Sequence, residues 1–295
     1  SGTLAPHILI IIIWTWVVMV FIVGVMYLVF YRLTEHPFNI TPDPRYLYMT
    51  KHHREAFNAL LYGITQRKGF IELTGEVGTG KTTLCRAVLS QLSRDETIET
   101  ALILNPSLTE TQLLRAILHD FGIRARSRDR LAYLEDLNQF LLKRNSEGAN
   151  VALVIDEAQN LSSEVMEQVR LLSNLETDQH KLIQIVLAGQ PELGQRLSSP
   201  DLRQLRQRIQ VRYHIPLLTL EETAAYINHR LKMAGNNGTL NFDDKAVETI
   251  YKYSHGTPRM INAVCENALL AGFVAGSRTI DQGCVKRAIQ HLEGK

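Results

Sequence analysis

Nine residues constrain the fold of this chain more than any other stretch: GEVGTGKTT, from Gly75 to Thr83. They match the pattern G-x-x-x-x-G-K-[ST] without a gap, and they stand between the short apolar run FIELTG and a segment with helical spacing. Glycines let a backbone turn so tightly that its N–H groups surround a phosphate, and the start of a helix adds favourable partial charge. The stretch therefore predicts a strand, a phosphate-binding loop and a helix, in that order.

The side chains of this loop predict that its ligand is a nucleoside triphosphate with a magnesium ion. We expect the Lys81 ammonium to contact the phosphates during catalysis and the Thr82 hydroxyl to ligate Mg²⁺. The predicted nucleotide-binding residues cover the whole loop: Gly75, Glu76, Val77, Gly78, Thr79, Gly80, Lys81, Thr82 and Thr83.

The segment VALVIDEAQN, which begins at Val151, supplies the second half of the expected site. Its nearly continuous apolar run is typical of a central strand in a parallel sheet, and two acids follow it. We expect Asp156 to hold the magnesium ion together with Thr82, and Glu157 to act as the general base on the attacking water. The alternative is that the two acids only end the strand, but the loop upstream favours the catalytic interpretation.

Polar residues further along the chain are candidates for completing the site. Gln190 follows the apolar run LIQIVLAG, where it either orients water and senses the γ-phosphate or is an ordinary loop amide. The stretch LRQLRQRIQVRYHIPL carries Arg203, Arg206, Arg208 and Arg212. One of them could reach the γ-phosphate of a neighbouring subunit, where such a residue is worth about 10³- to 10⁵-fold in rate. The alternative is a solvated basic face with pairs inside the subunit.

Arg259 stands at the start of a predicted helix, directly after Gly256, Thr257 and Pro258. A cation is unfavourable at a helix N-terminus by itself. We therefore expect its side chain to point towards the phosphates of the nucleotide.

Neither the histidines nor the cysteines have the spacing of a metal site. We expect the histidines to lie at the surface or at helix caps, among them His52, His53, His119 and His291. The three cysteines are far apart in the sequence and odd in number, which predicts a reducing compartment without a disulfide framework.

The order of the expected elements predicts the fold class. Apolar runs alternate with helical patterns as β-α-β-α-β-α-β, which implies a P-loop parallel sheet with helices on both faces. Beyond Pro216 we expect only helices. The predicted domains are therefore an α/β nucleotide-binding core at residues 36–215 and an all-α lid at residues 216–295.

Residues 8–31, ILIIIIWTWVVMVFIVGVMYLVFY, carry no charged side chain. As a helix of 24 residues they would be about 36 Å long, against a hydrocarbon core of about 30 Å, which predicts a transmembrane helix. Lys and Arg follow this run but do not precede it, so the rest of the chain should lie in the cytoplasm. Two alternatives stay open. The run is a buried core helix, or residues 1–25 are an upstream extension of a soluble cytoplasmic protein that starts at Met26.

Taken together, these motifs resemble those of the AAA+ ATPases. The resemblance is more specific to the general secretion pathway protein A (ExeA/GspA) family, and it rests on HPFNITPDPRYLYMT, GEVGTGKTTLCR, VIDEAQNL, QIVLAGQPEL and GTPRMINAVCENALLAG. It implies ATP as the nucleotide, bound at a site between subunits. It also implies that Gln190 is the first sensor residue, that Arg259 is the second, and that Arg208 is the arginine donated in trans, with Arg206 as the second choice.

The resemblance and the apolar run predict an ATPase at the bacterial inner membrane, anchored by its N-terminal helix and facing the cytoplasm. We expect it to form a homo-oligomer. ATP hydrolysis would remodel an unidentified envelope or secretion partner, in type II secretion, pilus assembly or exopolysaccharide export.

Two other functions compete with this prediction. One is a DNA-associated helper ATPase of the transposition (TniB-like) type, because that branch of AAA+ proteins has much of the same core. The formal net charge of +2 argues against a polybasic nucleic-acid binder, although a local basic face stays open, so DNA is not the favoured partner. The other is a nucleotide-gated scaffold that hydrolyses poorly, which the presence of Glu157 disfavours.

Overall fold

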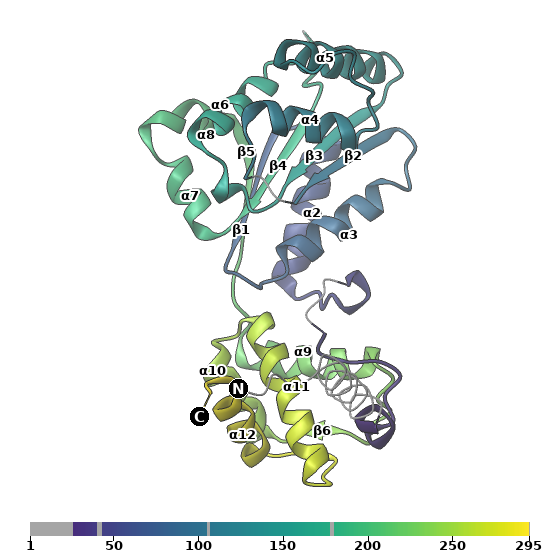
Figure 1. The fold of residues 1–295 in the computed structure, drawn as a ribbon, viewed down its shortest axis with the longest axis vertical. Coiled ribbons are helices and arrows are strands. Elements are labelled where there is room, and N and C mark those ends of the chain that lie inside the picture. Colours follow the sequence, from purple (N-terminus) through teal and green to yellow (C-terminus); the bar gives the residue numbers. More distant parts are fainter. Residues whose placement is uncertain (1–25, 40–42, 105–106, 178–179, 295) are drawn as a thin grey trace, which may run out of the picture. The chain divides into compact units, whose positions relative to one another are not determined.

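The structure is a computed structural model that describes residues 26–39, 43–104, 107–177 and 180–294. The chain forms two compact units (Figure 1). One unit contains the described residues from 43 to 217, and the other combines the described residues from 218 to 294 with residues 26–39. Residues 36–39 therefore lie in the second unit, whereas the sequence placed them in the α/β core.

The first unit is built on a five-stranded parallel sheet with the strand order β2-β3-β4-β1-β5. Its strands are β1 (Phe70–Gly75), β2 (Ile98–Ile103), β3 (Asn150–Ile155), β4 (Gln184–Gly189) and β5 (Ile209–Ile215). The predicted α/β class with a parallel sheet is confirmed. The fifth strand was not foreseen. Only its first and last residues are buried, and the five between them are exposed or half-buried, because β5 lies at the edge of the sheet.

Helices cover both faces of this sheet (Figure 1). Their bounds are α2 (Lys51–Thr65), α3 (Lys81–Leu92), α4 (Glu110–Asp120), α5 (Arg130–Ser146), α6 (Ser163–Leu172), α7 (Pro191–Leu197) and α8 (Arg203–Arg208). Short 3-10 turns occur at η1 (Pro44–Tyr46), η2 (Ala158–Asn160) and η3 (Pro200–Leu202).

Successive residues of the central strands face two different hydrophobic cores. Phe70 of β1 packs in the core with α4, α5 and α6, whereas Ile71 packs in the core with α2 and α3. Leu153 and Val154 of β3 divide in the same way. A strand that is buried on both faces needs an apolar side chain at nearly every position, which explains the continuous apolar run that identified β3.

The second unit is mainly helical, with α9 (Leu220–Met233), α10 (Asp244–Ser254), α11 (Pro258–Val274) and α12 (Gln282–Leu292). It also contains a parallel pair of two-residue strands, β6 (Asn241–Phe242) and β7 (Thr279–Ile280), which the all-α prediction did not include. A capping box starts α9, because Thr219 accepts from the Glu222 N–H while the Glu222 carboxylate accepts from the Thr219 N–H.

The end of the predicted membrane span is packed into this helical unit. Residues 26–31 are helical, and Tyr27 and Tyr31 are buried. The Tyr31 hydroxyl donates to the carbonyl oxygen of Leu269 on α11 at 2.9 Å, and burial raises the pKa of this phenol well above its ordinary value. The rest of the predicted span, residues 8–25, lies outside the described residues. Within the described part of the chain, no helix combines the length and the apolar character needed to cross a membrane.

Candidate nucleotide-binding site

The loop between β1 and α3 has the backbone of a phosphate cradle. Gly80 precedes α3 with φ = 94°, a left-handed conformation that favours glycine. Gly75 ends β1 so close to the neighbouring strand that an added Cβ would stand 2.8 Å from the carbonyl oxygen of Ile215. No side chain caps the first turn of α3, so its N–H groups are available to an anion.

Lys81 is the first residue of α3, and its side chain folds back onto the loop. It is only 5% exposed, and its Nζ donates to the carbonyl oxygens of Gly75 at 2.7 Å and Glu76 at 2.9 Å. Burial lowers the pKa of the ammonium, while the nearby Glu157 and Asp156 carboxylates oppose that shift. A dianionic phosphate in the cradle would give this buried cation a stronger partner than two neutral carbonyls.

Thr82 and Asp156, the two predicted magnesium ligands, are in direct contact. The Thr82 hydroxyl donates to Oδ2 of Asp156, which follows β3 and is 2% exposed. Burial raises the pKa of Asp156, and the hydrogen bonds from Thr82 and from the Glu157 N–H partly offset that increase. A hydroxyl and one carboxylate are the few hard oxygen ligands that Mg²⁺ usually takes from a protein when phosphates supply the others.

The Glu157 carboxylate is held by two amide side chains. Its Oε2 accepts from Nε2 of Gln159 at 2.6 Å and from Nε2 of Gln190 at 3.3 Å. Gln159 also accepts from the Gln190 N–H at 3.1 Å, so the three residues form one network between the ends of β3 and β4. Gln159 was not among the residues predicted from the sequence, although its position two residues after Glu157 placed an amide near that carboxylate.

His53 also belongs to the site. It lies in the capped first turn of α2, beside the N-cap residue Thr50, so the expected cap position is met, but its side chain is buried and not at the surface. It is 4% exposed on α2, and its Nε2 lies 2.9 Å from the carbonyl oxygen of Thr79 in the phosphate loop. Its Nδ1 lies 2.7 Å from the Thr50 hydroxyl. A carbonyl only accepts, so Nε2 carries the proton and Nδ1 accepts from Thr50.

This contact orients a backbone group of the cradle. In a trans peptide the C=O and the following N–H point in opposite directions. His53 holds the Thr79 carbonyl towards α2, so the Gly80 N–H is directed away from α2. That N–H makes no backbone hydrogen bond within the described residues.

The arginine candidates are in different situations. Arg208 donates to the Ser173 hydroxyl at 2.5 Å and to Oδ1 of Asn174 at 2.6 Å, so its guanidinium is occupied within its own subunit. Arg212 pairs with Glu72 at 3.1 Å. Arg206 is exposed, and its side chain has no partner within the described residues. Arg259 is exposed on the first turn of α11, in the helical unit.

Comparisons with known proteins identify the family of the chain. Residues 64–197 match the sequence family described as an AAA domain. General secretion pathway protein A of Aeromonas hydrophila is 47% identical over 270 residues, which are 91% of this chain and 49% of that protein. This chain belongs to the AAA+ ATPases of the general secretion pathway protein A family. The predicted resemblance is thereby confirmed, and the chain spans about half the length of this relative.

Solved AAA+ structures have the same fold at low sequence identity. Aeropyrum pernix ORC2 superposes with a TM-score of 0.65 at 16% identity, over 87% of this chain and 71% of that one. The Thermotoga maritima RuvB Holliday junction branch migration motor has a TM-score of 0.55 at 21% identity, over 81% and 69% of the two chains. At these identities the likeness supports the fold of the chain and gives no information about its partner.

Proposed function

We propose that this chain binds ATP with Mg²⁺ at the Gly75–Thr83 loop and hydrolyses it to ADP and phosphate. The observation that carries the proposal is the convergence of the Lys81 ammonium, the Thr82–Asp156 pair and the amide-held Glu157 at the carboxyl ends of β1 and β3. These are the groups that phosphoryl transfer uses. The cation would meet the phosphates, the oxygen ligands would meet the metal, and the carboxylate would meet the attacking water.

The residues of the chain divide the chemistry between positioning and proton transfer. Lys81 and the N–H groups of the loop would bind and orient the phosphates, and Mg²⁺ held by Thr82 and Asp156 would neutralise their charge. Glu157 would take the proton of the attacking water, and Gln159 and Gln190 would fix the direction of its carboxylate. We also propose that the Gln190 amide contacts the terminal phosphate, because it lies next to Glu157 at the end of β4.

We further propose that the chain works as a homo-oligomer in which a neighbour donates an arginine. Arg208 was the first choice for that residue, but its two hydrogen bonds to Ser173 and Asn174 tie it to its own subunit. Arg206 is the better candidate, because it is exposed and its side chain has no partner within the described residues. We propose in the same way that Arg259 approaches the phosphates from the helical unit.

The proposed setting of this activity is envelope export at the bacterial inner membrane, with the ATPase in the cytoplasm and an envelope or secretion protein as its partner. The support for this setting is the 47% identity to general secretion pathway protein A. The membrane contact is proposed for residues 8–25 alone and rests on their apolar composition, because residues 26–31 pack into the helical unit.

Three versions of the chain test the proposed reaction: the parent, Lys81→Ala and Glu157→Gln. We expect the parent to hydrolyse ATP in a Mg²⁺-dependent reaction and Lys81→Ala to lose nucleotide binding. Glu157→Gln should bind Mg·ATP within about threefold of the parent yet hydrolyse it about 10²- to 10⁴-fold more slowly, because only the general base is removed. Glu164→Gln, an exposed acid at the start of α6, is the matched control. Hydrolysis by Glu157→Gln at the parent rate would show that Glu157 is not the base.

A further inference from the structure

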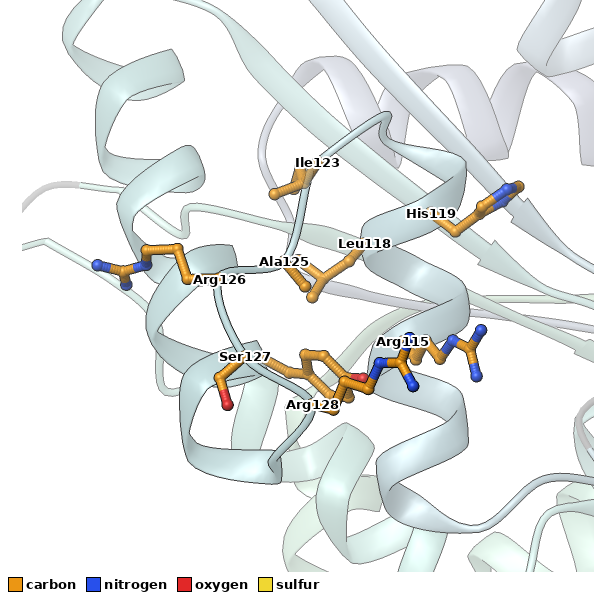
Figure 2. Close-up of a pocket in the computed structure, with 9 residues that line it drawn as sticks. Arg115, Leu118, His119, Ile123, Ala125, Arg126, Ser127 and Arg128 are labelled. Carbon is orange, nitrogen blue, oxygen red and sulfur yellow. The ribbon is translucent and has the colours of Figure 1, made fainter.

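A second concave site lies in the α/β unit, between α4, the segment that follows it and α5 (Figure 2). Its volume is about 340 Å³. It is lined by Arg115, Leu118, His119, Ile123, Ala125, Arg126, Ser127, Arg128 and Tyr133. These residues include no part of the Gly75–Thr83 loop and neither Asp156 nor Glu157, so the pocket is separate from the nucleotide site described above.

The pocket carries uncompensated positive charge. Three arginines line it and no carboxylate does. Arg126 is neutralised by Asp136, which also accepts from the Arg126 N–H at 2.9 Å. Arg115 and Arg128 make no ion pair with any described residue, and both line the pocket (Figure 2). Two guanidinium groups are therefore free to bind an anion.

The nearest acid in the sequence is already engaged. Asp129 caps α5 by accepting from the Ala132 N–H at 2.9 Å, and it accepts from the Ser127 hydroxyl at 2.8 Å. It does not line the pocket. The charge of Arg128 is therefore left for a ligand, while the Ser127 hydroxyl has already used its proton.

Tyr133 adds a hydrogen-bond donor to the pocket. The residue is 4% exposed and lines the pocket, and its hydroxyl makes no hydrogen bond to a described residue. The hydroxyl itself is accessible to solvent, so it is available to a ligand. An acceptor oxygen in the pocket would satisfy the Tyr133 hydroxyl and meet the guanidinium groups of Arg115 and Arg128 at the same time.

The apolar part of the lining is formed by Leu118, Ile123 and Ala125. We propose that the pocket is a second ligand site that binds a small phosphomonoester carried on a ring-containing body, of the nucleoside monophosphate class. A phosphomonoester is close to a dianion at neutral pH, which matches two guanidinium groups, and its oxygens only accept. The pocket volume lies in the range of small-molecule sites, and its apolar wall would pack against the ring.

The test is calorimetric titration of the full chain carrying Lys81→Ala, so that the phosphate loop contributes little. Three probes are compared: adenosine 5′-monophosphate, adenosine without its phosphate, and inorganic phosphate. Each is titrated into that chain, into versions with Arg115→Gln plus Arg128→Gln or with Tyr133→Phe, and into a version with Arg124→Gln. Arg124 is the matched control, because it is exposed in the same segment but does not line the pocket.

We expect the monophosphate to bind, and both adenosine and inorganic phosphate to bind at least about tenfold more weakly. The double arginine variant should weaken monophosphate binding by at least about tenfold and Tyr133→Phe by about threefold, with Arg124→Gln within about twofold of the parent. Tyr133→Phe keeps the buried ring, so it tests the hydroxyl without emptying the core. The proposal is overturned if the monophosphate does not bind at millimolar concentration. It is also overturned if Arg124→Gln weakens binding as much as the pocket variants do, or if either fragment binds as tightly as the monophosphate.

Discussion

Replacing His53 by alanine should weaken nucleotide binding without removing any group that touches the nucleotide. The imidazole is the side chain that holds the Thr79 carbonyl, and Thr79 is only 2% exposed. A buried acceptor left without its partner costs about 1–3 kcal/mol. Once His53 is gone, the Thr79–Gly80 peptide can turn in the free protein, and binding must then restore the orientation of the Gly80 N–H. If that cost falls on the bound state, affinity for Mg·ATP drops by about 5- to 150-fold.

The assay is equilibrium binding of Mg·ATP, together with the KM and kcat of hydrolysis. Because His53 positions the cradle and does not contact the reacting atoms, KM should rise far more than kcat falls. His53→Gln, which keeps an N–H donor, should recover part of the loss. His52→Ala is the matched control, because the neighbouring His52 contacts the Tyr213 hydroxyl at 3.2 Å and not the phosphate loop. The reasoning is refuted if His53→Ala binds Mg·ATP within twofold of the parent, or if His52→Ala loses as much.

Further expectations concern the catalytic residues and the arginines. Gln159→Ala should lower kcat by about tenfold with little change in nucleotide affinity, because it removes the 2.6 Å bond to Glu157, and steady-state kinetics would measure this. Burial raises the pKa of Asp156, so as pH falls this proposed metal ligand takes up a proton at a higher pH than an ordinary Asp does. Metal and proton compete for the carboxylate, so the acid limb of the pH–rate profile should move to lower pH as the Mg²⁺ concentration is increased. Arg206→Ala should reduce hydrolysis by about 10³-fold or more while leaving the melting temperature nearly unchanged. Arg208→Ala should instead lower the free energy of unfolding by about 1–3 kcal/mol, because it removes the hydrogen bonds to Ser173 and Asn174. Mixing each arginine variant with Glu157→Gln subunits would show whether ATPase activity is restored in trans.

The elements that could be predicted from the sequence are those whose own residues carry a clear hydrophobic pattern. β3 and β4 are apolar at nearly every position because both of their faces are buried, and this pattern can be read without knowing the fold. β1 is buried throughout as well, but it includes Glu72 and Thr74 and was recognised mainly because the glycine-rich loop follows it. β5 could not be read in this way. As an edge strand it has exposed positions, and the arginines around it made the segment look like a charged surface.

The residues of the site divide along a similar line. Lys81, Thr82, Asp156 and Glu157 are recognisable because phosphate chemistry prescribes their types and their positions after a strand. His53 has no such signature, because its role depends on α2 lying beside a loop 26 residues later in the chain. Arg208 was assigned by its place in a motif, and only the structure records that Ser173 and Asn174 already hold it.

The helical unit is assembled from two separate pieces of chain, with residues 42–217 inserted between them. The piece that carries Tyr27 and Tyr31 is not a loose leader, because Tyr31 donates to a carbonyl of α11. Two covalent connections therefore join the units, one before position 43 and one at Leu217–Leu218. The insertion therefore leaves the helical unit tied to the α/β unit at two places along the chain, so cutting the chain at Leu217–Leu218 alone would not separate the two units.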